Sequence, residues 1–198
     1  NAFLSTNISG RVGYWDITKG YNNTDFITPS GLVAYYHLDS NNGTVNYTSD
    51  SVGGKNGNCV NMSADCNFAS GVYNNGIAFD GVDDYITVSG TETYFSKTTG
   101  DTIGISLWVN SKDITQVNNP LVIKSVSTVT RVNYALVILT GRRLFFLSRN
   151  SANTISHVFS TTTQTLPVDQ WVHLYSTHTF GDGNSTAIYY NGEKTVAA

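Results

Sequence analysis

The chain has 198 residues, of which 13% are charged, and its formal net charge is −3. That length suits one β-rich domain with a full core and leaves little room for two. The small negative charge gives no attraction to nucleic acid or anionic lipid, so nucleic-acid binding is not expected. No stretch approaches the roughly 20 apolar residues of a membrane-spanning helix, so we expect no membrane span in this chain.

The composition is poor in charge and rich in residues that favour strands and turns, with 18 glycines and 12 tyrosines. Such a composition is typical of exported surface proteins, so we expect an extracellular or cell-surface location. The chain opens on Asn1 and its one methionine is Met62. We therefore expect a processed product or a piece of a longer chain, with any signal peptide outside it.

The first 30 residues predict two short strands, 2–8 and 11–18, followed by a polar connector. Residues 31–38 predict a buried strand, because apolar side chains fall on both of its faces. Residues 39–58 form a long stretch rich in Asn, Gly, Ser and Thr, which is too polar for a core and longer than most loops.

Cys59 and Cys66 are the only cysteines, and they stand close together in a segment rich in Gly and Asn. In an exported chain this spacing favours a local disulfide over two small buried thiols, although both interpretations remain open. Six Asn-x-Ser/Thr sequons offer glycan acceptors, a number that chance alone would give in this composition. They are Asn7, Asn22, Asn42, Asn46, Asn61 and Asn184.

Residues 76–88 predict a β-hairpin. Ile77 and Phe79 alternate before an acidic turn and Tyr85 follows it, while the Asp and Gly residues between them tolerate unusual backbone angles. The aspartates of this turn, together with Asp39, are candidate calcium ligands, since calcium takes carboxylate and carbonyl oxygens. The alternative is that they only shape turns. The candidates are Asp39, Asp80, Asp83 and Asp84.

The rest of the chain continues the β pattern. Residues 103–109 alternate apolar and small or polar side chains, with Trp108 on the outer face, where it could stack on a sugar ring. Strands 132–140 and 144–148 predict a hairpin that is apolar on both faces, so something must cover its second face. No helical period persists, and the chain is therefore expected to be an all-β, antiparallel two-sheet sandwich.

Several pieces of the chain resemble, in order, the laminin-G-like (concanavalin A-like lectin/glucanase) jelly roll. Residues 31–39 are similar to its opening strand and residues 50–57 to its Asp-Ser-x-Gly-x-x-Asn-Gly loop. The other matching pieces are 76–88, 105–109, 171–174 and 188–193. The resemblance implies that residues 31–198 form a jelly-roll sandwich, and that any calcium site carried over from the family falls on the four aspartates named above.

Family domains continue past the last of these pieces into closing strands, whereas this chain stops at Ala198. Residues 1–6 resemble the penultimate family strand and residues 8–17 the last one, which pairs with the opening strand. Residues 1–30 are therefore expected to supply closing strands, either to their own domain, to a neighbouring subunit or across the boundary of a tandem array. The apolar residues expected to pack are Phe3, Leu4, Ile8, Val12, Trp15 and Ile17.

The chain is not expected to be an enzyme. Its two glutamates, Glu92 and Glu193, lie in turn-like segments, and no Glu-x-Asp-x-x-Glu strand, nucleophile elbow or phosphate loop occurs. The first functional hypothesis is an exported subunit of an extracellular fibre, pilus-like filament or adhesive assembly, which forms a homopolymer by strand complementation through residues 1–28. The alternative is a calcium-dependent, glycan-binding lectin module of a larger extracellular protein.

Overall fold

The computed structural model describes residues 2–5, 31–39, 46–62, 66–89, 95, 97–112, 118–125, 132–149, 155–182 and 185–195, with the backbone alone for 2–5 and 155–163. Within these residues the regular structure consists of strands. They are β1 (Ala2–Ser5), β2 (Leu32–Tyr36), β3 (Tyr47–Thr48), β4 (Gly57–Val60), β5 (Phe68–Ser70), β6 (Asn75–Ile77), β7 (Tyr85–Thr87), β8 (Thr102–Asn110), β9 (Asn118–Ser125), β10 (Val132–Leu139), β11 (Arg143–Arg149), β12 (Ile155–Thr165), β13 (Trp171–Thr179), β14 (Ala187–Tyr190) and β15 (Glu193–Lys194).

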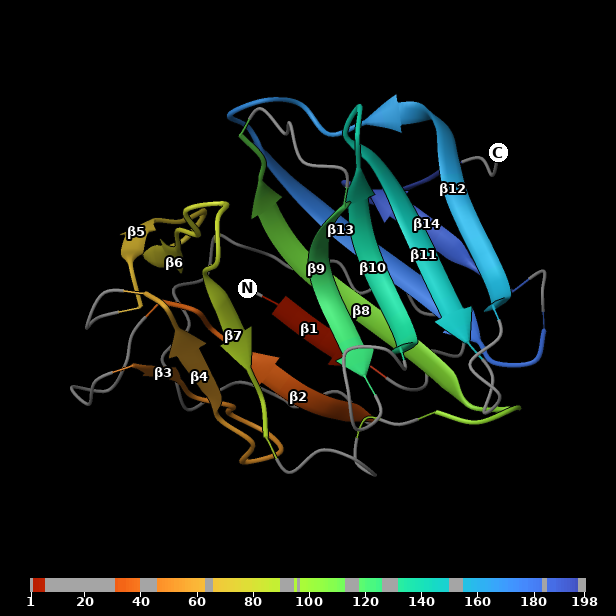
Figure 1. Ribbon diagram of the computed structural model, residues 1–198, viewed down its shortest axis with the longest axis horizontal. Coiled ribbons are helices and arrows are strands. Elements are labelled where there is room, and N and C mark those ends of the chain that lie inside the picture. Colours follow the sequence, from red (N-terminus) through yellow and green to blue (C-terminus); the bar gives the residue numbers. More distant parts are fainter. Residues whose placement is uncertain are drawn as a thin grey trace.

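Two stacked sheets form the body of the protein (Figure 1). The larger has the order β15-β14-β13-β8-β1-β2, and the four-stranded sheet in front of it has the order β12-β11-β10-β9. Two smaller sheets, β3-β4-β7 and β5-β6, form a separate lobe at the left of the view, here called the small lobe. All strand pairs are antiparallel, so the expected all-β antiparallel sandwich is confirmed. No described helix is long and apolar enough to cross a membrane.

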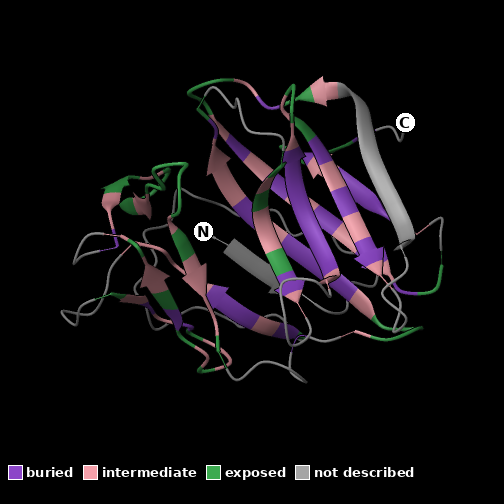
Figure 2. Cartoon of the chain, viewed as in Figure 1, coloured by how far each residue is buried: buried purple, intermediate pink, exposed green. Residues whose placement is uncertain are grey.

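The core lies between the two main sheets (Figure 2). Ile103, Ile105 and Leu107 of β8 are buried there, as their alternation predicts, and they meet Leu136 and Phe146 of the facing sheet in one apolar cluster. Burying each such side chain contributes about 2 kcal/mol. This alternation therefore fixes which face of β8 points inward.

The predicted hairpin of residues 132–148 is confirmed as β10 and β11, and its second face is partly covered. Ala135 and Val137 lie on the side away from the core and yet are buried. The register places Ala135 between Ile123 and Leu147, and Val137 opposite Phe145. Larger residues on neighbouring strands thus shield the smaller ones in the middle of the sheet.

The small lobe is held together by a covalent bond and close backbone packing. Cys59 of β4 and Cys66, which precedes β5, form the predicted disulfide, with their Cα atoms 5.5 Å apart. Gly57 lies where a Cβ atom would come within 2.6 Å of the Ile86 side chain on β7. A glycine at this position therefore lets β4 and β7 approach each other.

The predicted hairpin of residues 76–88 is wrong. β6 pairs with β5, and β7 pairs with β4, so the two expected arms belong to different sheets. Between them, the acidic residues Asp80 and Asp84 form hydrogen bonds within their own loop. These local bonds hold the connection as a loop, which leaves each arm to pair with an earlier strand.

Asp50 organises the loop that follows β3. Its Oδ1 accepts hydrogen bonds from the backbone N–H of Tyr35 (2.9 Å) and Val52 (3.0 Å), and its Oδ2 accepts one from Lys55 (3.1 Å). The N–H of Asp50 itself donates to Oδ1 of Asn56 at 3.0 Å. One largely buried carboxylate thus fastens the loop to β2.

Replacing Asp50 by Ala leaves three backbone donors without this acceptor, so the free energy of unfolding should fall by about 3 kcal/mol. Asp50→Asn, which keeps the shape and one acceptor oxygen, should cost less. The matched control is Asp39→Ala, because the Asp39 carboxylate accepts an exposed 3.4 Å bond from the Asn74 side chain, and the loss of this bond should cost under about 1 kcal/mol. Urea unfolding measures all three, and equal losses for Asp50→Ala and Asp39→Ala would refute this role.

Candidate functional site

The N-terminal strand β1 lies inside the larger sheet of its own chain (Figure 1). It pairs with β2 on one edge, Leu4 opposite Ala34, and with β8 on the other, Leu4 opposite Ile105. Without β1, both β2 and β8 would expose an edge of unpaired backbone groups. The strand therefore seals the middle of the larger sheet.

This place differs from the one expected from sequence. The resemblance assigns the position beside the opening strand to residues 8–17, whereas the structure places Ala2–Ser5 there, including Phe3 and Leu4. The remaining assembly candidates lie outside the described residues: Ile8, Val12, Trp15 and Ile17. The second predicted strand of the N-terminal segment stays a prediction.

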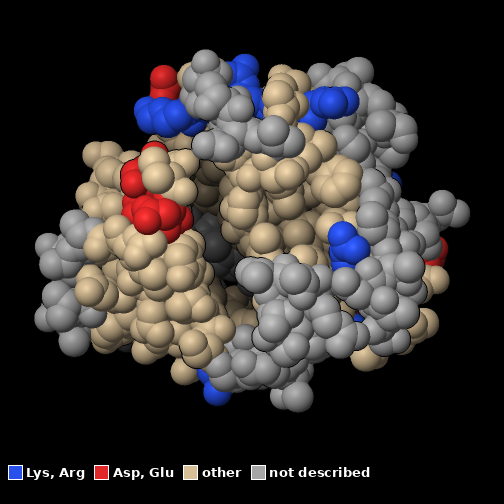
Figure 3. Space-filling model, viewed as in Figure 1, with Lys and Arg blue, Asp and Glu red and all other residues tan. Residues whose placement is uncertain are grey.

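An acidic loop stands on the exposed surface of the small lobe, where Figure 3 shows acidic side chains gathered together. One carboxylate oxygen from each of Asp80, Asp83 and Asp84 lies within 4.8 Å of the others. Asp80 Oδ1 accepts from the backbone N–H of Val82 (2.8 Å) and Asp83 (3.3 Å), and Asp84 Oδ2 accepts from the N–H of Asp80 (2.9 Å). Two of the three carboxylates therefore shape the loop directly.

Two asparagine side chains tie the acidic loop to the segment around the disulfide between Cys59 and Cys66. Asn61 Nδ2 donates to the carbonyl oxygen (3.1 Å) and to Oδ2 (3.0 Å) of Asp83. Asn67 Nδ2 donates to Asp84 Oδ2 at 3.1 Å. The hydrogen bond from the backbone N–H of Val82 lowers the pKa of Asp80, so this carboxylate stays ionised at neutral pH.

The three clustered carboxylates offer the hard oxygen ligands that calcium prefers. Asp39, the fourth predicted ligand, does not belong to this group among the described residues. Its carboxylate accepts from the Asn74 side chain at 3.4 Å and its carbonyl from the Asn75 side chain at 3.3 Å, at the turn between β5 and β6. Both predicted roles of the acidic loop, turn shaping and calcium binding, fit this geometry.

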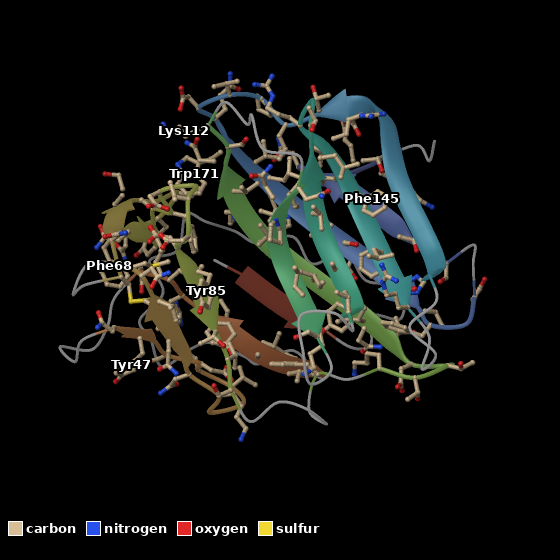
Figure 4. All side chains as sticks on the ribbon, in the orientation of Figure 1. Tyr47, Phe68, Tyr85, Lys112, Phe145 and Trp171 are labelled. Atoms are coloured by element: carbon tan, nitrogen blue, oxygen red, sulfur yellow. A yellow bond between two sulfur atoms is a disulfide. The ribbon has the colours of Figure 1, made fainter. Side chains whose placement is uncertain are left out.

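Trp108 lies on the face of the larger sheet that points away from the core. It is half-buried, and its ring contacts the ring of His173 on β13, with centroids 5.2 Å apart. Tyr175 and Tyr189 form a second ring pair on this face, with centroids 5.6 Å apart. In Figure 4, Trp171 marks the start of β13, whose odd-numbered residues line this outer face. We call the face the aromatic face.

A serine and a histidine are hydrogen-bonded on the aromatic face. Ser106 Oγ lies 2.8 Å from His173 Nε2. Among the described residues no carboxylate is hydrogen-bonded to His173, whereas in a catalytic triad such a group orients the base. Desolvation lowers the pKa of His173, and the imidazole is therefore neutral at pH 7.

Stability should fall when the solution becomes acidic enough to protonate His173. The unfolded chain takes up this proton near pH 6.5, whereas the folded chain takes it up only at a lower pH, so acidification through that window favours unfolding. His173→Gln keeps a polar group near Ser106 but removes the titration. Unfolding midpoints measured from pH 8 to pH 5 should therefore slope less in the variant, and parallel curves would contradict the assignment.

Two of the six sequons fall within the described residues. Asn46 and Asn61 are both exposed, whereas Asn7, Asn22, Asn42 and Asn184 lie outside the described residues. The side-chain nitrogen of Asn61 is the atom to which a glycan would be attached, and it makes both hydrogen bonds to Asp83. A glycan on Asn61 would therefore remove at least one of these bonds.

Sequence reasoning missed two features. The Asp-Ser-x-Gly pattern marks the Asp50 loop but does not show that its carboxylate reaches back to β2. The contact between Ser106 and His173 depends on the register of β8 and β13, which pairs His173 with Trp108. A single sequence does not show which residues of two paired strands lie next to each other, so this contact could not be predicted.

The comparison with protein families agrees with this architecture. A family model described as the concanavalin A-like lectin/glucanases superfamily, of the laminin-G type, matches residues 80–197, more than half of the chain. The chain belongs to this superfamily, and the expected family is confirmed.

Among solved structures, the chain is similar to an S-layer domain-containing protein from Clostridium thermocellum. The identity is 20%, the TM-score is 0.47, and the match covers 83% of this chain and 71% of that one. This distant likeness supports no functional argument. No curated protein matches the chain.

Proposed function

We propose that the protein is an exported structural subunit of an extracellular assembly, in which residues 1–28 of one copy complete a neighbouring copy. The proposal rests on the position of strand β1 in the larger sheet. A strand of four residues fills a gap between β2 and β8, and its last residue, Ser5, pairs with Leu32 although residues 6–31 lie between them. A hairpin needs only a few connecting residues. The long connection therefore lets the same strand leave its own sheet.

Exchange of β1 would cost little, because the strand of a second copy makes the same contacts in the same gap. Head-to-tail donation from copy to copy gives an open filament, whereas reciprocal donation closes a dimer. The disulfide between Cys59 and Cys66 and the low charge content fit an oxidising, extracellular location. The proposal assigns no catalytic step to the chain.

Removing residues 1–28 should convert polymeric protein into monomers that expose the gap between β2 and β8. Adding a synthetic peptide of residues 1–28 should then give capped monomers of higher thermal stability, since the peptide restores both ladders. Light scattering after size-exclusion chromatography measures the first effect, and a thermal melt the second.

A point variant of the full-length chain tests the same proposal if the truncated chain fails to fold. Leu4→Pro places a residue without an N–H in a strand that is paired on both edges, so it should abolish assembly. Asn23→Pro in the connector should leave assembly intact. Full-length protein that is monomeric, and unchanged in that respect by the truncation, would refute the proposal.

The aromatic face favours a second candidate, a glycan-binding module with calcium held by Asp80, Asp83 and Asp84. Half-buried rings such as Trp108 present flat apolar surfaces on which sugar rings stack. On a glycan array, Trp108→Ala should weaken binding roughly tenfold, as the loss of one stacking contact does. Tyr73→Ala, at an exposed aromatic residue of the small lobe, is the control. A chelator should also weaken binding, and no binding to any glycan would count against this candidate.

A further inference from the structure

Two strand edges face each other across a hollow on the front of the molecule. β7 ends the order β3-β4-β7 of the small lobe, and β9 ends the order of the four-stranded sheet. In the described part of the chain, neither strand pairs with another strand on its outer side. Figure 1 shows β7 and β9 as neighbours with a gap between them, and Figure 3 shows a hollow in this region of the surface. We call this gap the edge slot.

The edges of the slot carry apolar side chains rather than the charges that usually protect a free edge. Ile123 on β9 is 50% exposed and Tyr85 on β7 is 51% exposed. The lysine of β9, Lys124, is buried and gives the edge no exposed charge. Pro120, also on β9, suits an edge strand because it has no N–H to donate. An incoming strand would cover apolar surface and pair with backbone on both sides.

The sequence that follows β1, residues 8–17, is predicted to form a strand. Only Thr6 and Asn7 separate Ser5 from residues 8–17, a spacing that would suit a tight hairpin. Both edges of β1 are occupied by β2 and β8, so the strand predicted at residues 8–17 would need an edge other than that of β1. These residues carry apolar side chains at Val12, Trp15 and Ile17, and as a strand they would extend over about 33 Å, enough to run along all of β9.

We propose that residues 8–17 of a second copy add as a strand in the edge slot, between β7 and β9. This inference rests on the proposed function and names its acceptor. The added strand joins the small lobe to the four-stranded sheet, giving one continuous sheet of the order β3-β4-β7-donor-β9-β10-β11-β12. The donor copy thus contributes both β1 and the strand after it, one to each sheet of the acceptor sandwich.

Cross-linking between copies tests the acceptor. Protein that carries Val12→Cys is coexpressed with protein that carries Ile123→Cys, while the native disulfide stays intact in both. A residue in the added strand comes within about 5.5 Å of its partner on β9, so a disulfide should link the two chains. Thr165→Cys on β12, at the opposite edge of the same sheet, is the matched control, and it should link at least tenfold less.

A second pair of variants tests the slot without new cysteines. Ile123→Lys adds a charge to the edge of the slot and should abolish assembly. Val168→Lys changes another exposed apolar residue, 36% exposed and outside the slot, and should not. Circular dichroism should be unchanged in both variants.

The outcomes separate this inference from the proposed function. Polymers that form without a link to Ile123→Cys, or that tolerate Ile123→Lys, would overturn the slot as acceptor and leave strand exchange standing. Monomers at every concentration would overturn both. A chain that carries Val12→Cys and Ile123→Cys together and forms the link within one monomer would show that the slot is filled from its own chain, which also overturns the proposal.

Discussion

The register between β8 and β13 determines both faces of the larger sheet. Leu107 stands opposite Leu174 on the core side, while Trp108 stands opposite His173 on the other side. A slip of one residue would bring the polar and aromatic face into the core and the aliphatic face into water. The core and the aromatic face are therefore two consequences of one pairing, and neither can change without the other.

The small lobe depends on different forces. Its strands are short, and the disulfide and the acidic loop hold them together locally, while the Asp50 carboxylate fastens its loop to β2 of the larger sheet. The body of the sandwich, in contrast, is held by apolar burial between two sheets. Because the lobe has its own local contacts, it can keep its internal structure although, within the described residues, the outer edge of β7 pairs with no strand.

Much of the fold could be predicted because its signals are local. The alternation of residues 103–109 gave the inward face of β8, and the turn after β10 gave the hairpin with β11. The pairing of strands that are distant in the sequence was harder to predict. The arms of residues 76–88 pair with β4 and β5, and Ala2–Ser5 takes the place expected for residues 8–17, because alternation shows that a segment is a strand but not which edge it meets.

Because the Asn61 amide is both a possible glycan acceptor and a hydrogen-bond donor to Asp83, the acidic loop depends on the cell that makes the protein. A cell that glycosylates this sequon attaches the sugar while the chain is still being synthesised and unfolded, before the amide can reach Asp83. The acidic loop then closes with one bond fewer, or not at all. The same sequence produced in two hosts would thus differ in the surface of the small lobe, because the glycosylation machinery of the host acts on Asn61 before folding does.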